Sequence, residues 1–229
     1  MKTKEPTIGI CVSTFRREEL LIKMLLQIKE RTFYQNYKVY IVIDHEEDRR
    51  TLKKIEESRI IEILPIEKIE MFPSSVEAVK VVNRGYSIGD EPYFVWFNDD
   101  MEVEEGWLRE AMKCMQTFPD KEGLVVFQDG IQNGRNACAG LISRNYIKMK
   151  LNGIFHNEIY EHYYADTELF GKSRMINKVK YCPAAIVWHN HPGGKGNHKV
   201  KADDVYIQSR FLVERDRKIF NLRKREGFK

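Results

Sequence analysis

The sequence has little of several features that mark specialised classes of protein. Its four cysteines, Cys11, Cys114, Cys138 and Cys182, stand far apart and form no C-x-x-C pair, which is typical of a reducing compartment. The apolar run 8–12 has about a quarter of the ~20 residues that a membrane helix requires and is too short for a signal-peptide core. The chain also lacks a low-complexity linker and an internal repeat. We therefore expect a soluble, cytoplasmic chain that folds as a single domain.

The chain also has little excess of one charge over the other. Lys and Arg number 38 against 34 Asp and Glu, so the formal charge is +4, too small to mark the whole chain as a polyanion binder. The excess is local, because residues 205–229 contain eight Lys or Arg and three Asp or Glu. Hydrophobic residues make up 42% of the 229 residues and aromatic residues 11%, enough to close a core and to exclude disorder.

Short apolar runs alternate with helical patterns along the first half of the chain. Strands are predicted at 8–12, 39–43, 60–64, 93–97 and 123–127, with a polar helix over 46–58. Ser74 with Glu77 three residues later predicts a capped helix start. The second half is mixed: we expect a helix over 166–176 and a strand over 179–188. The alternation predicts right-handed βαβ crossovers and a mostly parallel sheet that is covered on both faces.

Polar side chains follow three of the predicted strands, at the carboxyl ends where such sheets bind ligands. They are residues 13–16, Asp44, and the run Asn98, Asp99 and Asp100. The last run crowds oxygens where a divalent cation and a phosphate-bearing ligand could meet. A polar turn before an acidic helix start is the alternative. We favour the ligand site, because the run follows an aromatic strand and contains no glycine to make a tight turn.

From these residues the chain resembles family 2 glycosyltransferases, which have the GT-A fold. Residues 97–108 resemble the L-N-x-D-x-x-V-x-P-G-W-L segment that carries the family's D-x-D metal motif, and residues 10–17 resemble its opening V-I-P-T-Y-N-R turn. Residues 42–44, 83–85, 139–144, 153–158, 166–169 and 187–189 match further family segments in the same order. The resemblance implies an α/β GT-A-type Rossmann-like sandwich with a mostly parallel central sheet. Its expected parts are a nucleotide-sugar-binding half (8–128), an acceptor and catalytic half (129–202) and a basic C-terminal helix (203–229).

The resemblance also implies the chemistry, a metal-dependent inverting transfer of a sugar from a nucleotide diphosphate sugar to an acceptor hydroxyl. Asp100, assisted by His189, would hold Mn²⁺ or Mg²⁺ against the leaving diphosphate, and Asp166 would be the general base. The residues expected beside the nucleotide sugar are Thr14, Arg16, Asp44, Asn83, Arg84, Asn98 and Asp99. The acceptor stays open between a saccharide, a lipid-linked saccharide, a protein and a modified nucleic-acid base.

Two departures from the family pattern bear on this chemistry. Asn98 replaces the first carboxylate of D-x-D, so metal affinity should be weaker. Ala165 replaces the Glu of the E-D pair, which deprives Asp166 of one like-charge neighbour that would raise its pKa. Other readings remain for single residues: Asp166 as a helix N-cap, Asp44 as a strand-end turn and Arg84 as a solvated cation.

The C-terminal part adds ligands and positive charge. His189 and His191 precede a Pro-Gly-Gly turn and the basic segment 195–201, and the resemblance implies a loop there that closes over the donor. Apolar residues at sevenfold spacing within 205–220 predict an amphipathic helix that packs on the body or, in a homodimer, on a second subunit. The same basic tail is compatible with a phospholipid surface or nucleic acid.

Two other classes of function compete with the enzyme. A catalytically silent sugar-nucleotide or glycan-binding module would explain the departures at Asn98 and Ala165. A metal-dependent nuclease would use the His-Asn-His run beside a carboxylate cluster, although such a module does not need the preceding βαβ series.

Overall fold

The computed structural model describes residues 5–45 and 49–228. Its strands are β1 (Ile8–Thr14), β2 (Tyr37–Ile43), β3 (Ile66–Met71), β4 (Tyr93–Asn98), β5 (Met101–Val103), β6 (Leu124–Gln128), β7 (Gly140–Ser143) and β8 (Val179–His189). Its helices are α1 (Glu18–Arg31), α2 (Arg49–Ser58), α3 (Ala78–Ile88), α4 (Trp107–Gln116), α5 (Arg144–Lys150), α6 (Ala165–Met175), α7 (Asp204–Ser209) and α8 (Leu212–Arg225). In the described residues the strands form one sheet in the order β3-β2-β1-β4-β7-β6-β8-β5.

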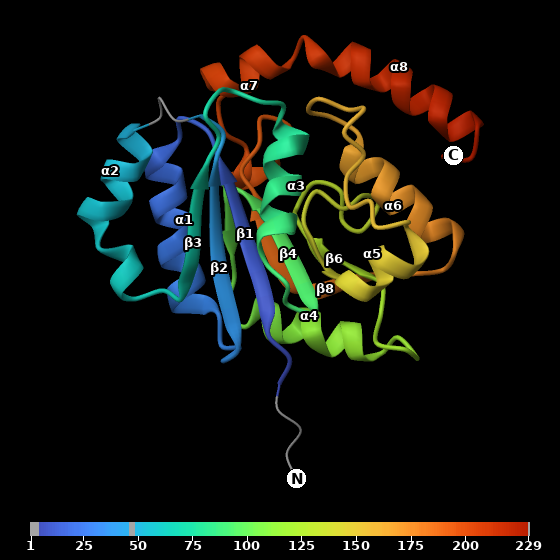
Figure 1. The fold of residues 1–229 in the computed structure, drawn as a ribbon, viewed down its shortest axis with the longest axis horizontal. Helices are drawn as coiled ribbons and strands as arrows, with labels where there is room; N and C mark the ends of the chain where they lie inside the picture. The colour runs from blue at the N-terminus through green and yellow to red at the C-terminus, as the bar shows by residue number, and fades with distance from the viewer. Residues whose placement is uncertain (1–4, 46–48, 229) are drawn as a thin grey trace.

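The sheet is covered on both faces, as the sequence predicts. Strands β3, β2, β1 and β4 are parallel, as are β6 and β8, whereas β7 and β5 pair antiparallel with their neighbours. Helices α1, α2 and α4 supply the core on one face, and α3, α5 and α6 supply it on the other. Helices α7 and α8 run across the top of the molecule in Figure 1, above α3 and α6. The expected α/β class is therefore confirmed.

The core begins with the first apolar run of the chain. Ile8, Ile10 and Val12 of β1 are fully buried in the cluster under α1, and Cys11 faces the opposite cluster. Burying each of the three aliphatic side chains stabilises the fold by about 1.5–3 kcal/mol. On the Cys11 side, α3 comes so close that a Cβ at Gly85 would overlap the Sγ of Cys11. A glycine is therefore required at this point of α3.

One predicted strand is wrong. Residues 60–64 do not form a strand; they contain a 3₁₀ turn at Ile60–Glu62, and the third strand is β3. Ile60 and Leu64 are buried while Ile61 and Ile63 are exposed, which is the i, i+4 spacing of a helical turn. The true strand was hidden because β3 lies at the edge of the sheet and carries charged residues, as edge strands commonly do.

Two of three predicted helix starts differ in the structure, and the third lies outside the described residues. The helix after Ser74 begins at Ala78 with Glu77 at the N-cap and no side-chain cap, so the capping box is wrong. The helix predicted over 46–58 is α2, and its first three residues lie outside the described part. Helix α6 begins at Ala165 after Tyr164, so Asp166 lies in the first turn and is not the N-cap.

The basic C-terminal segment forms two helices, α7 and α8, instead of the single helix expected over 203–229. Its anchor is Asp216 of α8, which is fully buried. The Asp216 carboxylate accepts hydrogen bonds from the backbone N–H groups of Glu161, His162 and Tyr163, at 3.4, 2.9 and 2.8 Å. Helix α8 thus holds the segment that leads into α6. None of the helices in the described residues is both long enough and apolar enough to cross a membrane.

Replacing Asp216 tests this anchor. We expect Asp216→Ala to lower the free energy of unfolding by about 3 kcal/mol, because buried N–H groups lose their acceptor. Glu214→Ala, on the exposed face of the same helix, is the control and should change stability by less than about 0.5 kcal/mol. Urea denaturation followed by circular dichroism measures both variants. Equal midpoints for the two would show that α8 is not anchored through Asp216.

Candidate functional site

A cleft of about 630 Å³ opens where the carboxyl ends of β1, β2 and β4 meet the segments before α6 and after β8. The parallel pairing of these strands brings their last residues together, since β1 lies between β2 and β4. Of the residues expected at the site, those that line the cleft are Thr14, Asp44, Asn98, Asp99, Asp100, Asp166 and His189. Segments more than 150 residues apart in the sequence therefore share one wall.

Asp99 is turned into the protein at the base of the cleft and is 4% exposed. Its carboxylate accepts a hydrogen bond from the Thr14 hydroxyl at 2.7 Å and one from Arg17 at 3.2 Å. Burial raises the pKa of Asp99, and the negative charge of Asp100 raises it further. Asp99 and Thr14 therefore join the ends of β4 and β1, and the side chain of Asp99 faces these partners.

Asp100 and His189 form the part of the cleft that suits a metal ion. The Oδ1 atom of Asp100 lies 3.4 Å from Nε2 of His189, and neither that oxygen nor Nδ1 of His189 has a hydrogen-bond partner among the described residues. Burial raises the pKa of Asp100, but His189 and Arg17 outweigh it and hold the pKa below its ordinary value. In the described chain no group of three or more His, Cys, Asp or Glu side chains is placed to hold a metal.

Asp44 lies at the end of β2 and is 8% exposed. Its carboxylate accepts hydrogen bonds from the backbone N–H of Val76 at 2.8 Å and from the Ser75 hydroxyl at 3.0 Å. The segment before α3, which the sequence predicted as a helix cap, therefore closes on Asp44. Both carboxylate oxygens keep a further lone pair for a ligand in the cleft.

Asp166 lies in the first turn of α6, where its carboxylate is held on both sides. Its Oδ1 accepts from the N–H of Thr167 at 2.7 Å, and its Oδ2 accepts from Nδ2 of Asn136 at 3.0 Å. Burial raises the pKa of Asp166, and these hydrogen bonds lower it only in part. Glu168, the nearest rival carboxylate, points away and binds Tyr160 and Arg223, as its place on the helix predicts.

Three of the expected residues are not brought to the cleft. Arg16 is exposed, with its guanidinium 4.8 Å from the centre of the adjacent Phe15 ring. Asn83 hydrogen-bonds the backbone of His156, and Arg84 pairs with Glu70 of β3. These three residues do not line the cleft of this structure, and their place beside a nucleotide stays a prediction.

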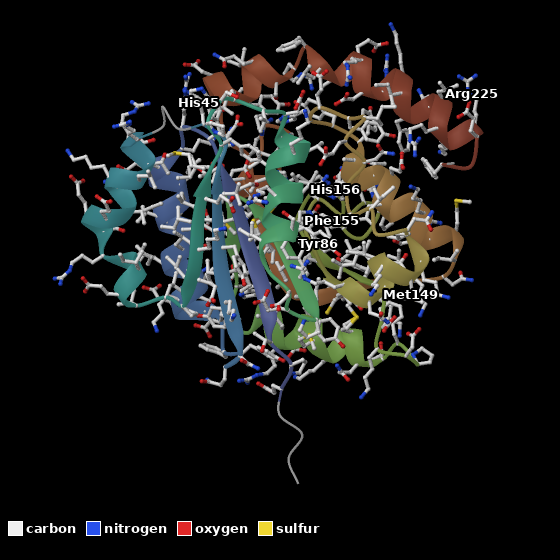
Figure 2. All side chains as sticks on the ribbon, viewed as in Figure 1. His45, Tyr86, Met149, Phe155, His156 and Arg225 are labelled. Atoms are coloured by element: carbon white, nitrogen blue, oxygen red, sulfur yellow. The ribbon has the colours of Figure 1, made fainter. Side chains whose placement is uncertain are left out.

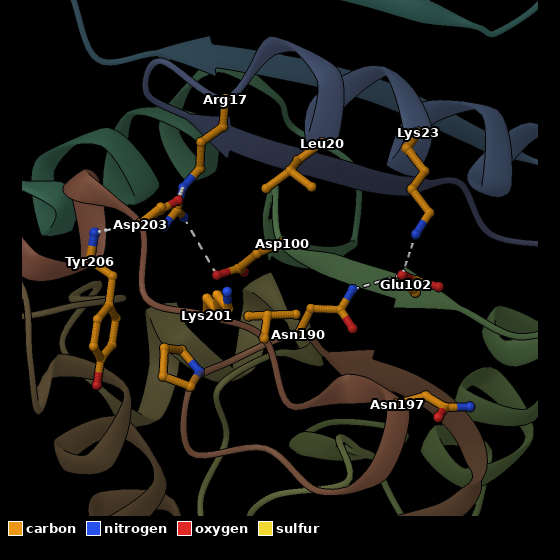
Figure 3. Close-up of a pocket in the computed structure, with 12 residues that line it drawn as sticks. Arg17, Leu20, Lys23, Asp100, Glu102, Asn190, Asn197, Lys201, Asp203 and Tyr206 are labelled. Carbon is orange, nitrogen blue, oxygen red and sulfur yellow. Dashed lines mark hydrogen bonds and ion pairs between the residues drawn. The ribbon is translucent and has the colours of Figure 1, made fainter.

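Arg17, for which no role at the site was predicted, lines the cleft, whereas Arg16 does not. Its guanidinium binds both oxygens of Asp203, at 2.7 and 2.8 Å, and reaches Asp99 and Asp100. Figure 3 shows it between Asp203 and Asp100, on the wall of a smaller cavity of about 400 Å³ next to the main cleft. The signal was present, because Arg17 aligns with the last residue of the V-I-P-T-Y-N-R pattern.

Asn136 and His156 were also missed. Asn136 comes from the Gly- and Asn-rich loop after β6 and reaches Asp166 across 30 residues of sequence. His156 lines the cleft at 6% exposure and stacks on Phe155, as its position beside that ring in Figure 2 indicates. Burial lowers the pKa of His156 to about 3, so its imidazole is neutral at pH 7. His156 lies within the family segment 153–158, so a signal for it was present, whereas no family segment contains Asn136.

Comparison with known proteins agrees with this geometry. The model of glycosyl transferase family 2 matches residues 9–179, whereas no curated protein matches the chain. The mannosyltransferase PcManGT from Pyrobaculum calidifontis, in complex with GDP-Man and Mn²⁺, superposes with a TM-score of 0.66 at 13% identity, over 82% of this chain and 57% of that one. TarS 1-349 from S. aureus, in complex with UDP-GlcNAc, gives a TM-score of 0.63 at 11% identity, over 88% of this chain and 64% of that one.

At these identities the solved structures establish the fold alone. The chain spans 57% and 64% of the length of those two chains, and 36% of a longer TarS chain. The family model, in contrast, covers well over half of the 229 residues. The resemblance seen in the sequence is thereby confirmed: the chain belongs to glycosyl transferase family 2 and has a GT-A-type fold.

Proposed function

We propose that the protein is an inverting, metal-dependent glycosyltransferase that uses a nucleotide diphosphate sugar. The observation that carries the proposal is that one cleft contains the Asp100–His189 pair and, from another part of the chain, the fixed carboxylate of Asp166. The first group suits a diphosphate with its cation, and the second suits the proton of an attacking hydroxyl. The ligands of the two similar solved structures, GDP-Man with Mn²⁺ and UDP-GlcNAc, support a donor of this class.

The donor base would lie at the β2 end of the cleft. Asp44 is fixed by Ser75 and Val76, and a carboxylate held in this way accepts readily from an imide N–H of uracil or a ring N–H of guanine. Asn98 is exposed at the end of β4 and lines the same cleft, so its amide is available to the diphosphate or the sugar. Thr14 and Asp99, occupied with each other, would shape the cleft floor.

Asp100 and His189 fit a divalent ion. Oδ1 of Asp100 and Nε2 of His189 lie 3.4 Å apart and both residues line the cleft, so the pair could hold one ion. The Oδ1 atom of Asp100 has no hydrogen-bond partner among the described residues, so it is available as a ligand. The ion would supply Lewis-acid stabilisation of the leaving diphosphate. Further ligands would come from the diphosphate and from water, since the described part of the chain has no group of three or more His, Cys, Asp or Glu side chains placed to hold a metal.

Asp166 would act as the base. Inversion at the anomeric carbon requires in-line attack, so the hydroxyl must lose its proton to a group on the side opposite the diphosphate. Asn136 and Thr167 hold the carboxylate in one orientation, and its raised pKa makes it a better proton acceptor than an exposed aspartate. The candidate acceptors remain a saccharide, a lipid-linked saccharide, a protein and a modified nucleic-acid base.

Removal of the metal site should weaken donor binding. We expect Mn²⁺, and Mg²⁺ less strongly, to raise the affinity for UDP or GDP, and we expect Asp100→Ala to abolish that gain in calorimetric titration. His189→Ala should weaken metal-dependent binding more than His191→Ala, because Nδ1 of His191 accepts the N–H of Gly193 instead. Equal nucleotide affinity in the presence of a chelator would contradict the metal site, and a larger loss in His191→Ala would reverse the two histidines.

Asp166→Asn tests the reaction itself. A thermal-shift screen of nucleotide sugars with Mn²⁺ identifies the donor, and NMR of the product reports its anomeric configuration. Because an amide cannot accept the proton, kcat should fall by a factor on the order of 10² to 10⁴ while donor affinity stays unchanged. Turnover near the wild-type rate, or a product with the donor's own configuration, would show that Asp166 is not the base. Donor binding without transfer or hydrolysis in the wild type would favour the silent module.

The pH dependence of kcat/KM gives an independent test of the base. Asp166 acts in its ionised form, so activity should fall as the pH drops through a pKa that burial raises above the ordinary value. Asn136→Ala removes a hydrogen bond that favours the ionised form. Its acid limb should therefore move to higher pH, even with His189 still nearby to favour the carboxylate. An acid limb at the same pH in Asn136→Ala as in the wild type would show that Asn136 does not influence the pKa of the base.

A further inference from the structure

The outer side of α7 and α8 combines exposed apolar groups with positive charge. Phe211, in the turn between the two helices, has the highest exposure among the large hydrophobic residues of the described chain, at 77%. Ile207 and Leu222 are 57% and 51% exposed. In Figure 1 both helices cross the top of the molecule, with no other element above them. This face is therefore open to a partner.

The helical repeat places two cations on the same face of α8 as these apolar groups. Positions 211, 218, 222 and 225 lie within about 60° of one another around the axis of α8, so Phe211, Lys218, Leu222 and Arg225 form one stripe. Lys218 reaches only Glu214, at 3.9 Å, and Arg225 forms no ion pair with another described residue. We call this stripe, together with Ile207, the outer stripe.

The outer stripe lies on the same two helices that border the cleft. Tyr206, Ser209, Leu212 and Val213 line the cleft, but Ile207 and Phe211 do not. The two helices therefore have the cleft on their inner side and the outer stripe on the other. A surface that bound the outer stripe would contact the helices that form one border of the cleft.

We propose that the outer stripe docks onto an anionic phospholipid membrane. A helix that lies in a bilayer interface presents apolar side chains to the acyl region and lysines or arginines to the headgroups, which is the composition of this stripe. A second copy of the chain fits less well, because a two-fold axis through the stripe would place Lys218 and Arg225 against their own copies. Nucleic acid would use the cations but leave Phe211 and Leu222 exposed to water.

Docking in this orientation brings the two helices that border the cleft to the membrane surface. If the proposed transferase activity holds, the acceptor hydroxyl would then belong to a lipid or a lipid-linked saccharide at that surface. This second step rests on the proposed function, whereas the docking itself does not.

Vesicle sedimentation tests the docking without any donor or acceptor. The full chain should bind vesicles of phosphatidylcholine mixed with phosphatidylglycerol, bind phosphatidylcholine alone weakly, and lose binding as salt is added. Phe211→Ser should reduce the partition coefficient at least about tenfold, and Lys218→Gln with Arg225→Gln should reduce it by about fivefold per cation. Thermal unfolding of each variant should match the wild type, because these side chains are exposed.

Matched controls come from α5, which carries exposed Met149 and Lys150 away from the outer stripe; Figure 2 labels Met149 and Arg225 in separate regions. Met149→Ser and Lys150→Gln should leave vesicle binding unchanged. The proposal is overturned if the wild type ignores anionic vesicles or if Phe211→Ser behaves as Met149→Ser does. It is also overturned if sedimentation equilibrium shows a dimer that Phe211→Ser dissociates. Vesicle binding in a chain that transfers no sugar would leave the docking intact and refute only the transferase.

Discussion

The buried carboxylate of Asp99 is the contact on which the arrangement of the cleft depends. It binds the Thr14 hydroxyl and Arg17, and so fixes the ends of the neighbouring strands β4 and β1. Arg17 in turn donates hydrogen bonds to both carboxylate oxygens of Asp203, the N-cap of α7. A buried carboxylate is costly unless it is hydrogen-bonded and paired. These partners are therefore required together, and they leave Asp100 alone of the two aspartates to face His189.

Helix α8 fixes the side of the cleft that α6 forms. Asp216 of α8 holds the backbone that leads into α6, and Arg223 of the same helix pairs with Glu168 on α6. The acidic residues of both contacts, Asp216 and Glu168, are buried. Leaving a buried carboxylate or its N–H donors without a partner would cost several kcal/mol. The position of Asp166 is thus set from two directions, by Asn136 in the loop between β6 and β7 and by helix α8.

Local sequence patterns predicted the structure correctly wherever a buried apolar run and the polar site residues next to it lie within one short segment. The apolar runs at β1, β2 and β4 and the polar residues that follow them predicted the parallel sheet and the cleft at its edge. Motif order predicted the family, and helix geometry correctly turned Glu168 away from Asp166. Pattern failed at β3, because an edge strand with charges lacks the burial that makes a strand visible in sequence.

What the sequence by itself determined was therefore the strands β1, β2, β4, β6 and β8, the family, and the residue types at the ends of β1, β2, β4 and β8. Only the tertiary structure decided which side chains of those ends enter the cleft. It selected Arg17 over Arg16, sent Asn83 and Arg84 to other partners, and brought Asn136 to Asp166. The physical reason is that hydrogen bonds and ion pairs across 30 to 186 residues depend on packing, which local periodicity does not encode.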